Sequence, residues 1–391
     1  MDFVNTKNFM DKLSNELVPG NSIVVNCDGK EIFNYSSGYA DYENKIPMTS
    51  QHLINIYSCT KVVTAVAVTQ LLEKGLINLD DCVYEFIPEF KNMFVQGENG
   101  ELFPAKTPIT IRQLLTHTAG LSYNTKSEHI KSLHSKTNGS FSTLEGVKAI
   151  AKIPLLFEPG TAWRYSLGHD VLGGIIEVVS GLSYADYVKQ KIFSPIGVND
   201  IFFEQTDDVL DKMAEQYNYS GEDIEDIVQL QMSANNKEKH FRNVGKANSL
   251  KLSKNYHSAG AGIITTVRSF ANFAQVLALG GKAPNGERIL EPSSVDLIRT
   301  NQLKGKQLEI FSWEHLNGYG YGLGVRTLMD KKTANSLSSI GEFGWGGAAG
   351  ATILVDPDKK LSFFYAHHML NPQEIYYQPR IRNAVYKDFN G

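Results

Sequence analysis

Residues 56–68 constrain the fold of this chain more than any other stretch. They read Ile-Tyr-Ser-Cys-Thr-Lys and continue as a run of Val, Thr and Ala. Residues three apart on a helix lie on one face, so Ser58 in the first turn brings its hydroxyl beside the amine of Lys61. A helix that is apolar nearly all round is buried in a core. The stretch therefore predicts a buried helix with a nucleophile and a base at its N-terminal end.

Burial of the helix would change the pKa of Lys61. Desolvation disfavours a charged amine, so we expect the pKa of Lys61 to fall from about 10.4 toward about 7 to 8. A neutral Lys61 could accept the Ser58 proton, and the helix N-terminus would favour an oxyanion. Ser-x-x-Lys occurs by chance in chains of this length, which leaves a surface lysine beside a helix cap as the alternative. The chain has no second such spacing.

Length and charge limit the class of protein. A chain of 391 residues exceeds one ordinary core, which indicates two structural units or one domain with a large insertion. The net charge of −4 gives no electrostatic case for binding nucleic acid or an anionic membrane. The N-terminal residues lack a basic segment followed by an apolar one, and no apolar run approaches about 18 residues. We expect a cytoplasmic protein with no membrane partner; the oligomeric state is left open.

Cysteines and histidines indicate neither disulfides nor metal. The three cysteines have no paired spacing, and Cys59, next to Ser58, is interpreted as a small buried apolar residue. The ten histidines form no metal-binding spacing, and His367 and His368 are expected on opposite faces of a strand. His117 follows a short capped helix, where we favour a structural role over a catalytic one. We predict no metal and no cofactor.

The order of predicted elements gives the fold class. An Asp-Gly turn at Asp28 joins two strand-like runs, which is a strong hairpin signal, and strands return near the C-terminus. We predict an α/β protein of the α+β type, with an antiparallel sheet flanked by helices and a large, mostly helical insertion. Residues 1–57 and 258–391 would form the sheet domain and residues 58–257 the helical domain, with the active site between them. The predicted helices are 7–17, 144–152, 170–179, 184–192, 270–279 and 376–386, and the strands are 22–26, 31–35, 321–328, 350–356 and 361–368.

Three segments outside this pattern are candidates for function. Residues 204–226 carry nine acidic side chains and residues 237–254 are basic and polar, which indicates a surface region, with a lid as the functional alternative. The loop 157–168 contains Tyr165, whose phenol could relay a proton if neighbouring cations lowered its pKa; a tyrosine packed in the core is the alternative. Glycines in residues 342–348 would let a ligand approach closely.

Taken together, these motifs resemble one family. Residues 58–61, the run 110–121, the tyrosine loop 163–167 and the later Gly-Trp-Gly-Gly at 344–347 resemble the penicillin-binding-protein-like serine hydrolases. These include class C β-lactamases and family VIII carboxylesterases, and the similarity runs from about Ser22 to the last strands. The joint order of the motifs is far more specific than any one of them.

The resemblance implies roles for individual residues. Ser58 would be the acylated nucleophile, Lys61 would help to deprotonate it, and Tyr165 would act as acid and base. The backbone N–H groups of Ser58 and Ala348 would form the oxyanion hole. Trp345, Gly346 and Gly347 would contact the substrate, with Trp345 shaping the pocket, and no metal or organic cofactor is implied.

Two departures from the lactamase pattern narrow the substrate. Trp345 begins a Trp-Gly-Gly motif where class C β-lactamases have Lys-Thr-Gly, so an anionic β-lactam would lose its ionic partner. Leu167 stands where the lactamases have Asn, and both changes resemble the esterase branch. We expect a serine hydrolase that acylates Ser58 and cleaves small esters with short acyl chains. A β-lactamase or a D-amino-acid peptidase is the alternative, and a non-catalytic relative that binds peptidoglycan is a further one.

Overall fold

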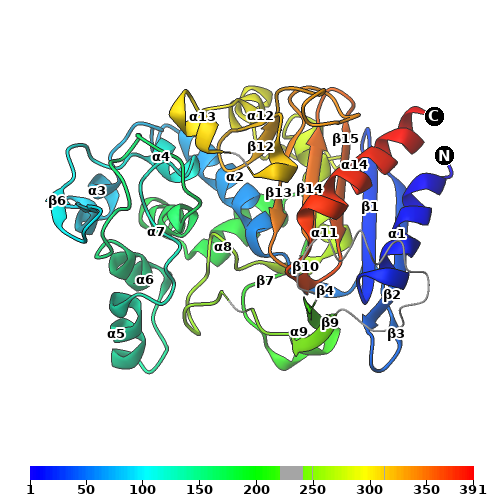
Figure 1. Cartoon of the computed structure of the whole chain (residues 1–391), viewed down its shortest axis with the longest axis horizontal. Coiled ribbons are helices and arrows are strands. Elements are labelled where there is room, and N and C mark those ends of the chain that lie inside the picture. Colours follow the sequence, from blue (N-terminus) through cyan, green and yellow to red (C-terminus); the bar gives the residue numbers. More distant parts are fainter. Residues whose placement is uncertain (221–240, 249, 312) are drawn as a thin grey trace.

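One large sheet fills one side of the molecule, and helices fill the other (Figure 1). The computed structural model describes residues 1–220, 241–248, 250–311 and 313–391. The sheet has eight strands in the order β11-β12-β13-β14-β15-β1-β2-β3, and every neighbouring pair is antiparallel. The strands are β11 (Tyr319–Tyr321), β12 (Arg326–Leu328), β13 (Phe343–Gly347), β14 (Ala351–Asp356), β15 (Leu361–Ala366), β1 (Gly20–Cys27), β2 (Lys30–Asp41) and β3 (Ile46–Pro47).

The hairpin of β1 and β2 shows how the sequence builds this sheet. Asp28 and Gly29 have φ values of 46° and 82°, the left-handed conformations that a tight hairpin turn requires. Successive residues of β1 point to opposite faces, so Val24 enters one hydrophobic core while Ile23 enters the other. The sheet is therefore buried on both sides, and the predicted hairpin is confirmed.

Helices cover the two faces of the sheet. The first helix, α1 (Val4–Glu16), packs beside the last one, α14 (Glu374–Asn390), and both termini lie at the same end of the molecule (Figure 1). The carboxylate of Asp388 accepts hydrogen bonds from the backbone N–H and the hydroxyl of Thr6, which ties the two helices together. The opposite face packs against α11 (Val267–Ala278).

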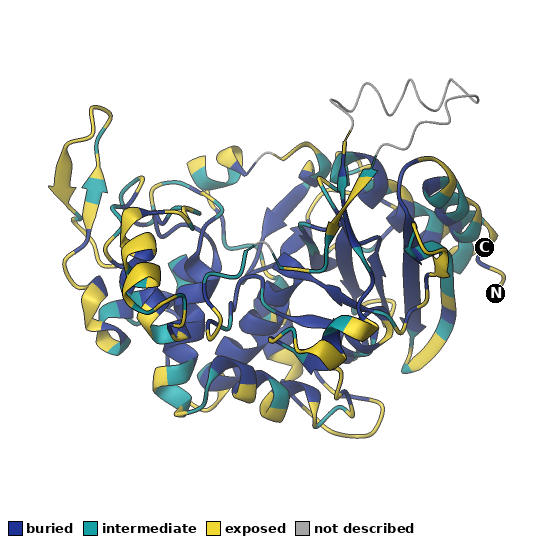
Figure 2. Cartoon of the chain, turned by 90° about the horizontal axis from the view of Figure 1, so that it is seen from below, coloured by how far each residue is buried: buried dark blue, intermediate teal, exposed yellow. Residues whose placement is uncertain are grey.

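The helical side is built around α2 (Thr60–Glu73), whose residues are buried as far as Leu71 (Figure 2). Apolar residues on every face of α2 leave it no solvent-facing side. The helices that pack against it are α7 (Gly168–Ser180), α8 (Tyr184–Val188) with the π-helical turn η3 (Lys189–Phe193), and α12 (Pro292–Arg299). The other described helices outside those on the sheet are α3 (Val83–Phe86), α4 (Ile111–Leu115), α5 (Glu128–Lys136), α6 (Thr143–Ile150), α9 (Asp207–Lys212) and α13 (Lys306–Ile310).

Three small sheets and three 3₁₀ turns complete the described chain. The first sheet joins β4, β10 and β7, the second joins β16, β8 and β9, and the third is the β5–β6 hairpin. The strands are β4 (Leu53–Asn55), β5 (Phe94–Gln96), β6 (Leu102–Pro104), β7 (Ile201–Phe202), β8 (Gln216–Tyr219), β9 (Phe241–Gly245), β10 (Ile264–Thr266) and β16 (Met369–Leu370), and the turns are η1 (Tyr57–Cys59), η2 (Pro88–Phe90) and η4 (Glu314–Leu316).

This architecture confirms the predicted fold class and corrects some of its details. The predicted strand 321–328 is two strands, because the chain turns at Gly324, where φ is 77°. The predicted strand 361–368 ends at Ala366, and His368 has a φ of 46°, so the two histidines do not alternate across a strand. The region 204–256 is not all surface, since β8 is mostly buried; residues 221–240 and 249 lie outside the described residues.

No single helix in the described ranges has the length and apolar character needed to cross a membrane. Only the bent combination of α7 with residues 184–193, which meet at 79°, meets these criteria as a pair.

Candidate active site

The turn before α2 places Ser58 beside strand β13 of the large sheet. Tyr57 has a φ of 45°, an uncommon conformation for a bulky residue, and its hydroxyl is anchored by a 2.8 Å hydrogen bond to the amide oxygen of Gln216. Gly347 in β13 lets the turn approach closely, because a Cβ there would lie 2.3 Å from the carbonyl oxygen of Ile56. Ser58 therefore sits where the sheet and the helical side meet.

Lys61 is fully buried one helical turn after Ser58. Its Nζ lies 3.2 Å from the Ser58 Oγ and donates a hydrogen bond of 2.7 Å to the carbonyl oxygen of Gly260. Burial lowers the pKa of Lys61 to about 7, although the negative charge of Asp170 acts in the opposite direction. The amine is thus poised to exchange a proton near neutral pH, in agreement with the shift expected from the sequence.

Asp170 is the carboxylate that acts on Lys61 from a distance. It lies in the first turn of α7, is buried, and accepts hydrogen bonds from the hydroxyls of Tyr256 at 2.9 Å and Ser258 at 2.7 Å. A Cβ at Gly260 would lie 2.5 Å from the Asp170 Oδ2 and 3.4 Å from the Lys61 Nζ, which shows how closely these groups surround that glycine. The sequence pattern around Asp170 does not mark it as a site residue, because only tertiary contacts bring it to the site.

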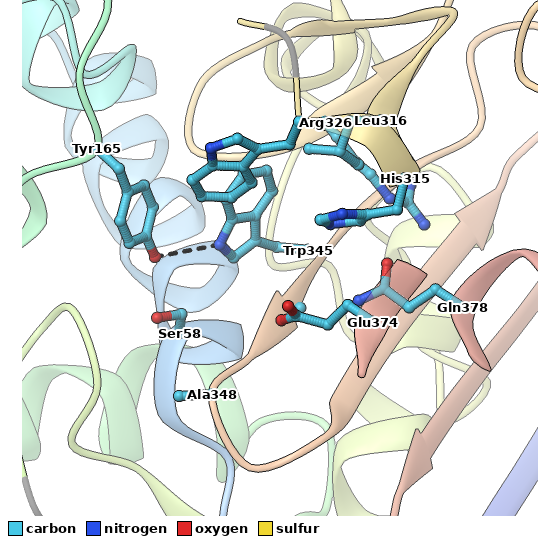
Figure 3. A pocket seen from close by; sticks show the side chains of 11 residues that line it. Ser58, Tyr165, His315, Leu316, Arg326, Trp345, Ala348, Glu374 and Gln378 are labelled. Carbon is cyan, nitrogen blue, oxygen red and sulfur yellow. Dashed lines mark hydrogen bonds between the residues drawn. The ribbon is translucent and has the colours of Figure 1, made fainter. Parts of the chain in front are cut away.

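Tyr165 lies across the pocket from the sheet, on the loop before α7. Its hydroxyl accepts a 3.2 Å hydrogen bond from the indole Nε1 of Trp345, drawn as a dashed line in Figure 3. The Lys61 Nζ is 4.7 Å from the centre of the Tyr165 ring, and the ring of Tyr123 stacks on Tyr165 at 5.5 Å. Tyr123 was also missed, since no local pattern marks it.

The pKa of Tyr165 corrects one expectation. A proton relay was suggested on the condition that neighbouring cations lower this pKa, but burial raises it well above the ordinary value, opposed by hydrogen bonds with Ser58 and Trp345. Tyr165 therefore holds its proton at neutral pH. The Tyr165 hydroxyl can therefore donate a proton, whereas the neutral Lys61 amine can accept one.

A cavity of about 140 Å³ opens beside Ser58 (Figure 3). Of the residues that the family resemblance places near the substrate, Trp345, Gly346 and Ala348 line this cavity, whereas Gly347 packs against the Ile56 carbonyl instead. Other lining residues include Trp313, His315, Arg326, Glu374 and Gln378, none of which the sequence analysis singled out. They come from distant segments that only the fold brings together.

The other sequence candidates lie outside this cavity. His117 is buried, its Nδ1 lies 3.2 Å from the Ser166 Oγ, and its ring packs against Tyr165 at 4.5 Å. Burial holds the pKa of His117 well below its usual range, so it packs as a neutral residue behind Tyr165. Cys59 is buried too, and its Sγ faces the backbone oxygen of Trp345 at 3.6 Å.

The family follows from a match over almost the whole sequence. A protein-family model described as Beta-lactamase matches residues 6–385. The chain belongs to the Beta-lactamase family. This β-lactamase-family chain is also 26% identical to the acyltransferase calJ of Penicillium decumbens, covering 92% of this chain and 86% of that protein. It is 32% identical to the esterase EstB of Burkholderia gladioli, over 50% of each chain.

Solved structures share the fold of this β-lactamase-family protein at low identity. EstCE1, titled a hydrolase with promiscuous acyltransferase activity, has a TM-score of 0.77 at 24% identity and covers 98% of this chain and 97% of its own. The D-amino acid amidase of Ochrobactrum anthropi has a TM-score of 0.71 at 22% identity, with complete coverage of both chains. The family and its neighbours are serine hydrolases and acyltransferases.

Proposed function

We propose that this protein is a serine hydrolase that forms an acyl-enzyme on Ser58 and cleaves small esters with short acyl chains. The observation that carries the proposal is the buried Lys61 amine, 3.2 Å from the Ser58 Oγ, with a pKa of about 7. A lysine that is half neutral near pH 7 can take the serine proton, which an ordinary surface lysine cannot.

The reaction would proceed in two steps. The Ser58 Oγ attacks the ester carbonyl carbon while its proton passes to Lys61, and collapse of the tetrahedral intermediate breaks the bond to the alcohol. Tyr165, protonated in the free enzyme, gives its proton to the departing alkoxide and regains one through Lys61. Water then attacks the acyl-enzyme with its proton going to the same pair, which releases the carboxylic acid and restores Ser58.

We assign the oxyanion hole to the backbone N–H groups of Ser58 and Ala348. Both residues line the cavity, one in the turn before α2 and the other in the turn after β13. Two N–H donors from separate elements would stabilise the charge that develops on the carbonyl oxygen. The close packing of Gly347 on Ile56 supports this assignment, because it fixes the two turns against each other.

The residues that line the cavity favour an ester over an anionic β-lactam as the substrate. Trp345 occupies the wall where a β-lactamase of the resembled class would hold a lysine, and the nearby Arg326 is paired with Glu342 at 3.1 Å. A carboxylate of an antibiotic would find no free cation among these lining groups. The likeness to a D-amino acid amidase keeps an amide or D-amino-acid substrate as the second candidate, together with a β-lactam.

Intact-protein mass spectrometry with p-nitrophenyl butyrate tests the proposal. Wild type should gain one butyryl group and release p-nitrophenol with turnover, while Ser58→Ala should show neither. Slow hydrolysis of nitrocefin compared with the ester would support the esterase assignment. Fast nitrocefin hydrolysis would favour a β-lactamase, and equal adduct formation by Ser58→Ala would refute the nucleophile.

Tyr165→Phe gives an independent test of the acid. It removes the hydroxyl but keeps the ring that packs on Tyr123 and Trp345. Turnover should fall by about 10²- to 10⁴-fold, because general acid–base groups contribute that much, while the thermal midpoint of unfolding stays near that of wild type. An unchanged kcat would remove Tyr165 from the mechanism.

A further inference from the structure

The cavity beside Ser58 contains a carboxyl group that the proposed mechanism does not use. It belongs to Glu374, the first residue of α14, and Figure 3 shows it directed toward the side of the cavity where Trp345 and Ser58 lie. Within the described residues, Glu374 has neither a hydrogen-bond nor an ion-pair partner. Burial alone raises its pKa to about 7, with no contribution from a nearby cation.

The other polar groups around the cavity do not compensate this charge. The guanidinium of Arg326 donates a 3.1 Å hydrogen bond to Glu342 and lies 4.9 Å from the centre of the Tyr319 ring. Burial and two nearby arginines lower the pKa of His315 to about 4, so it is neutral, and Gln378 carries no charge. Once Glu374 is ionised, the cavity has a negative charge that lacks a counterion.

Aromatic rings form the wall near this carboxyl group. The ring centres of Trp313 and Trp345 are 5.8 Å apart, and those of Trp345 and Tyr165 are 5.7 Å apart. Trp313 is 39% exposed, so part of its surface is available to a ligand. The faces of indole rings attract cations, and the attraction grows when the cation is desolvated. A carboxylate beside such faces is suited to an ammonium group and unsuited to an anion.

We propose that this cavity selects small esters that carry an amine or quaternary ammonium group, with Glu374 as the ionic partner and Trp313 and Trp345 as aromatic walls. The selection rests on the proposed ester hydrolysis at Ser58, since it names the substrate class of that same site. Gly346 leaves room on this side of the cavity, because a Cβ there would lie 2.8 Å from the Gln378 Nε2 and 3.8 Å from the Glu374 Oε1.

Direct binding tests this selectivity without requiring catalysis. Phenyltrimethylammonium and its neutral isostere tert-butylbenzene are titrated at about pH 8, where a carboxyl group of this pKa is mostly ionised, and tryptophan fluorescence reports binding. The proteins are wild type, Glu374→Gln and Glu374→Asp, and Glu128→Gln removes an equal charge from the exposed helix α5 as the matched control. Thermal unfolding establishes that each variant is folded.

The cation should bind wild type about tenfold more tightly than the neutral probe, and Glu374→Gln should abolish that preference while Glu128→Gln retains it. Glu374→Asp keeps the negative charge and should retain part of the preference for the cation. This variant therefore tests the role of the charge even if Glu374→Gln is misfolded. Equal affinity of wild type for both probes, or an unchanged preference in Glu374→Gln, would overturn the proposal.

Hydrolysis kinetics with a cationic and a neutral ester test the selectivity for cations separately from ester hydrolysis itself. Wild type should hydrolyse acetylcholine with a higher kcat/KM than the neutral isopentyl acetate, and Glu374→Gln should reduce the ratio of the two values. If wild type binds the cation selectively but hydrolyses neither ester, ester hydrolysis is refuted while the cation site stands. Hydrolysis of both esters at equal kcat/KM would refute the selectivity and leave the hydrolase assignment intact.

Discussion

Lys61 and Arg326 are two buried basic residues near one cavity, and their surroundings differ: Arg326 lines the cavity, while Lys61 lies beside the lining residue Ser58. Arg326 donates a 3.1 Å hydrogen bond to the carboxylate of Glu342, and that negative charge, acting against desolvation, raises its pKa. None of the described carboxylates forms an ion pair with Lys61, whose Nζ contacts the Ser58 hydroxyl and the carbonyl oxygen of Gly260. Desolvation dominates there and lowers the pKa to about 7.

The two environments favour different protonation states. A buried charge with a bonded partner stays charged and fixes its surroundings, whereas a buried amine with only a distant carboxylate can lose its proton at low cost. Arginine suits the first environment because it remains protonated, and lysine suits the second because its pKa shifts readily. In this protein Arg326 has the first kind of environment, and Lys61 has the second, which is the one that the proposed mechanism needs.

Replacing Lys61 should produce the largest effect, on activity. Lys61→Met removes the base and should lower kcat/KM for p-nitrophenyl butyrate by about a thousandfold or more. Lys61→Arg should be as inactive, because arginine cannot give up its proton. Steady-state kinetics checks both, with the exposed Lys131→Met as control. Substantial activity in Lys61→Arg would show that a neutral base is not required and would remove the contrast with Arg326.

Removing the counterion of the buried Arg326 should instead lower the stability of the protein. The Glu342 carboxylate is fully buried and accepts hydrogen bonds from the Tyr319 hydroxyl at 2.8 Å and from Arg326. Glu342→Gln leaves Arg326 buried without its counterion and should lower the free energy of unfolding by about 3 to 5 kcal/mol. Urea denaturation measures the change.

The surface pair of Asp296 and Arg299 provides the matched control. It has a similar separation of 2.8 Å, but the Asp296 side chain is 62% exposed. Asp296→Asn should change the free energy of unfolding by less than about 1 kcal/mol, because solvent screens exposed pairs. A loss in Glu342→Gln no larger than in Asp296→Asn would contradict the structural role of the buried pair.

The two cations also show what sequence can and cannot predict. The reactive environment of Lys61 was predictable because its causes are local: the spacing from Ser58 and the apolar residues of the same helix. The position of Tyr165 came from the family resemblance, since nothing in its loop specifies what it faces. Asp170, Tyr123 and Glu374 were missed because they reach the site from separate elements, and only tertiary packing brings such residues together.

The same contrast explains the fold details that the sequence missed. The hairpin at Asp28 was predictable because its turn residues and apolar runs are adjacent in the chain. The run 321–328 has no comparable local signal; it breaks at Gly324 because the backbone there packs against α2, where a Cβ would meet the Ala65 side chain at 3.3 Å. Local chemistry fixes the elements, and long-range packing decides where they end.

The lowered pKa of Lys61 should also appear in the pH dependence of stability. Its pKa is about 7 in the folded protein and about 10.5 in the unfolded chain, so between these values the unfolded state binds more protons. The free energy of unfolding of wild type should therefore rise with pH relative to Lys61→Met, by at most about 1.4 kcal/mol per pH unit. Below about pH 7 the difference should be constant. Denaturation curves of the pair from pH 6 to 10 measure it, and a flat difference would contradict the lowered pKa.

Removing the carboxylate charge of Asp170 should have the smallest effect, a shift in the pH dependence of kcat/KM. Asp170→Asn keeps an oxygen that can accept hydrogen bonds from Tyr256 and Ser258 but removes the negative charge that raises the pKa of Lys61. The pKa of Lys61 should fall further, so the amine stays neutral in more acidic solution and the acid limb of the kcat/KM profile moves to lower pH. Asp296→Asn, with the same charge change on the surface, should leave the limb in place. If the acid limb moves to higher pH instead, Asp170 acts on Lys61 through packing rather than through its charge. Lys61 would then resemble Arg326, whose surroundings depend on a nearby carboxylate.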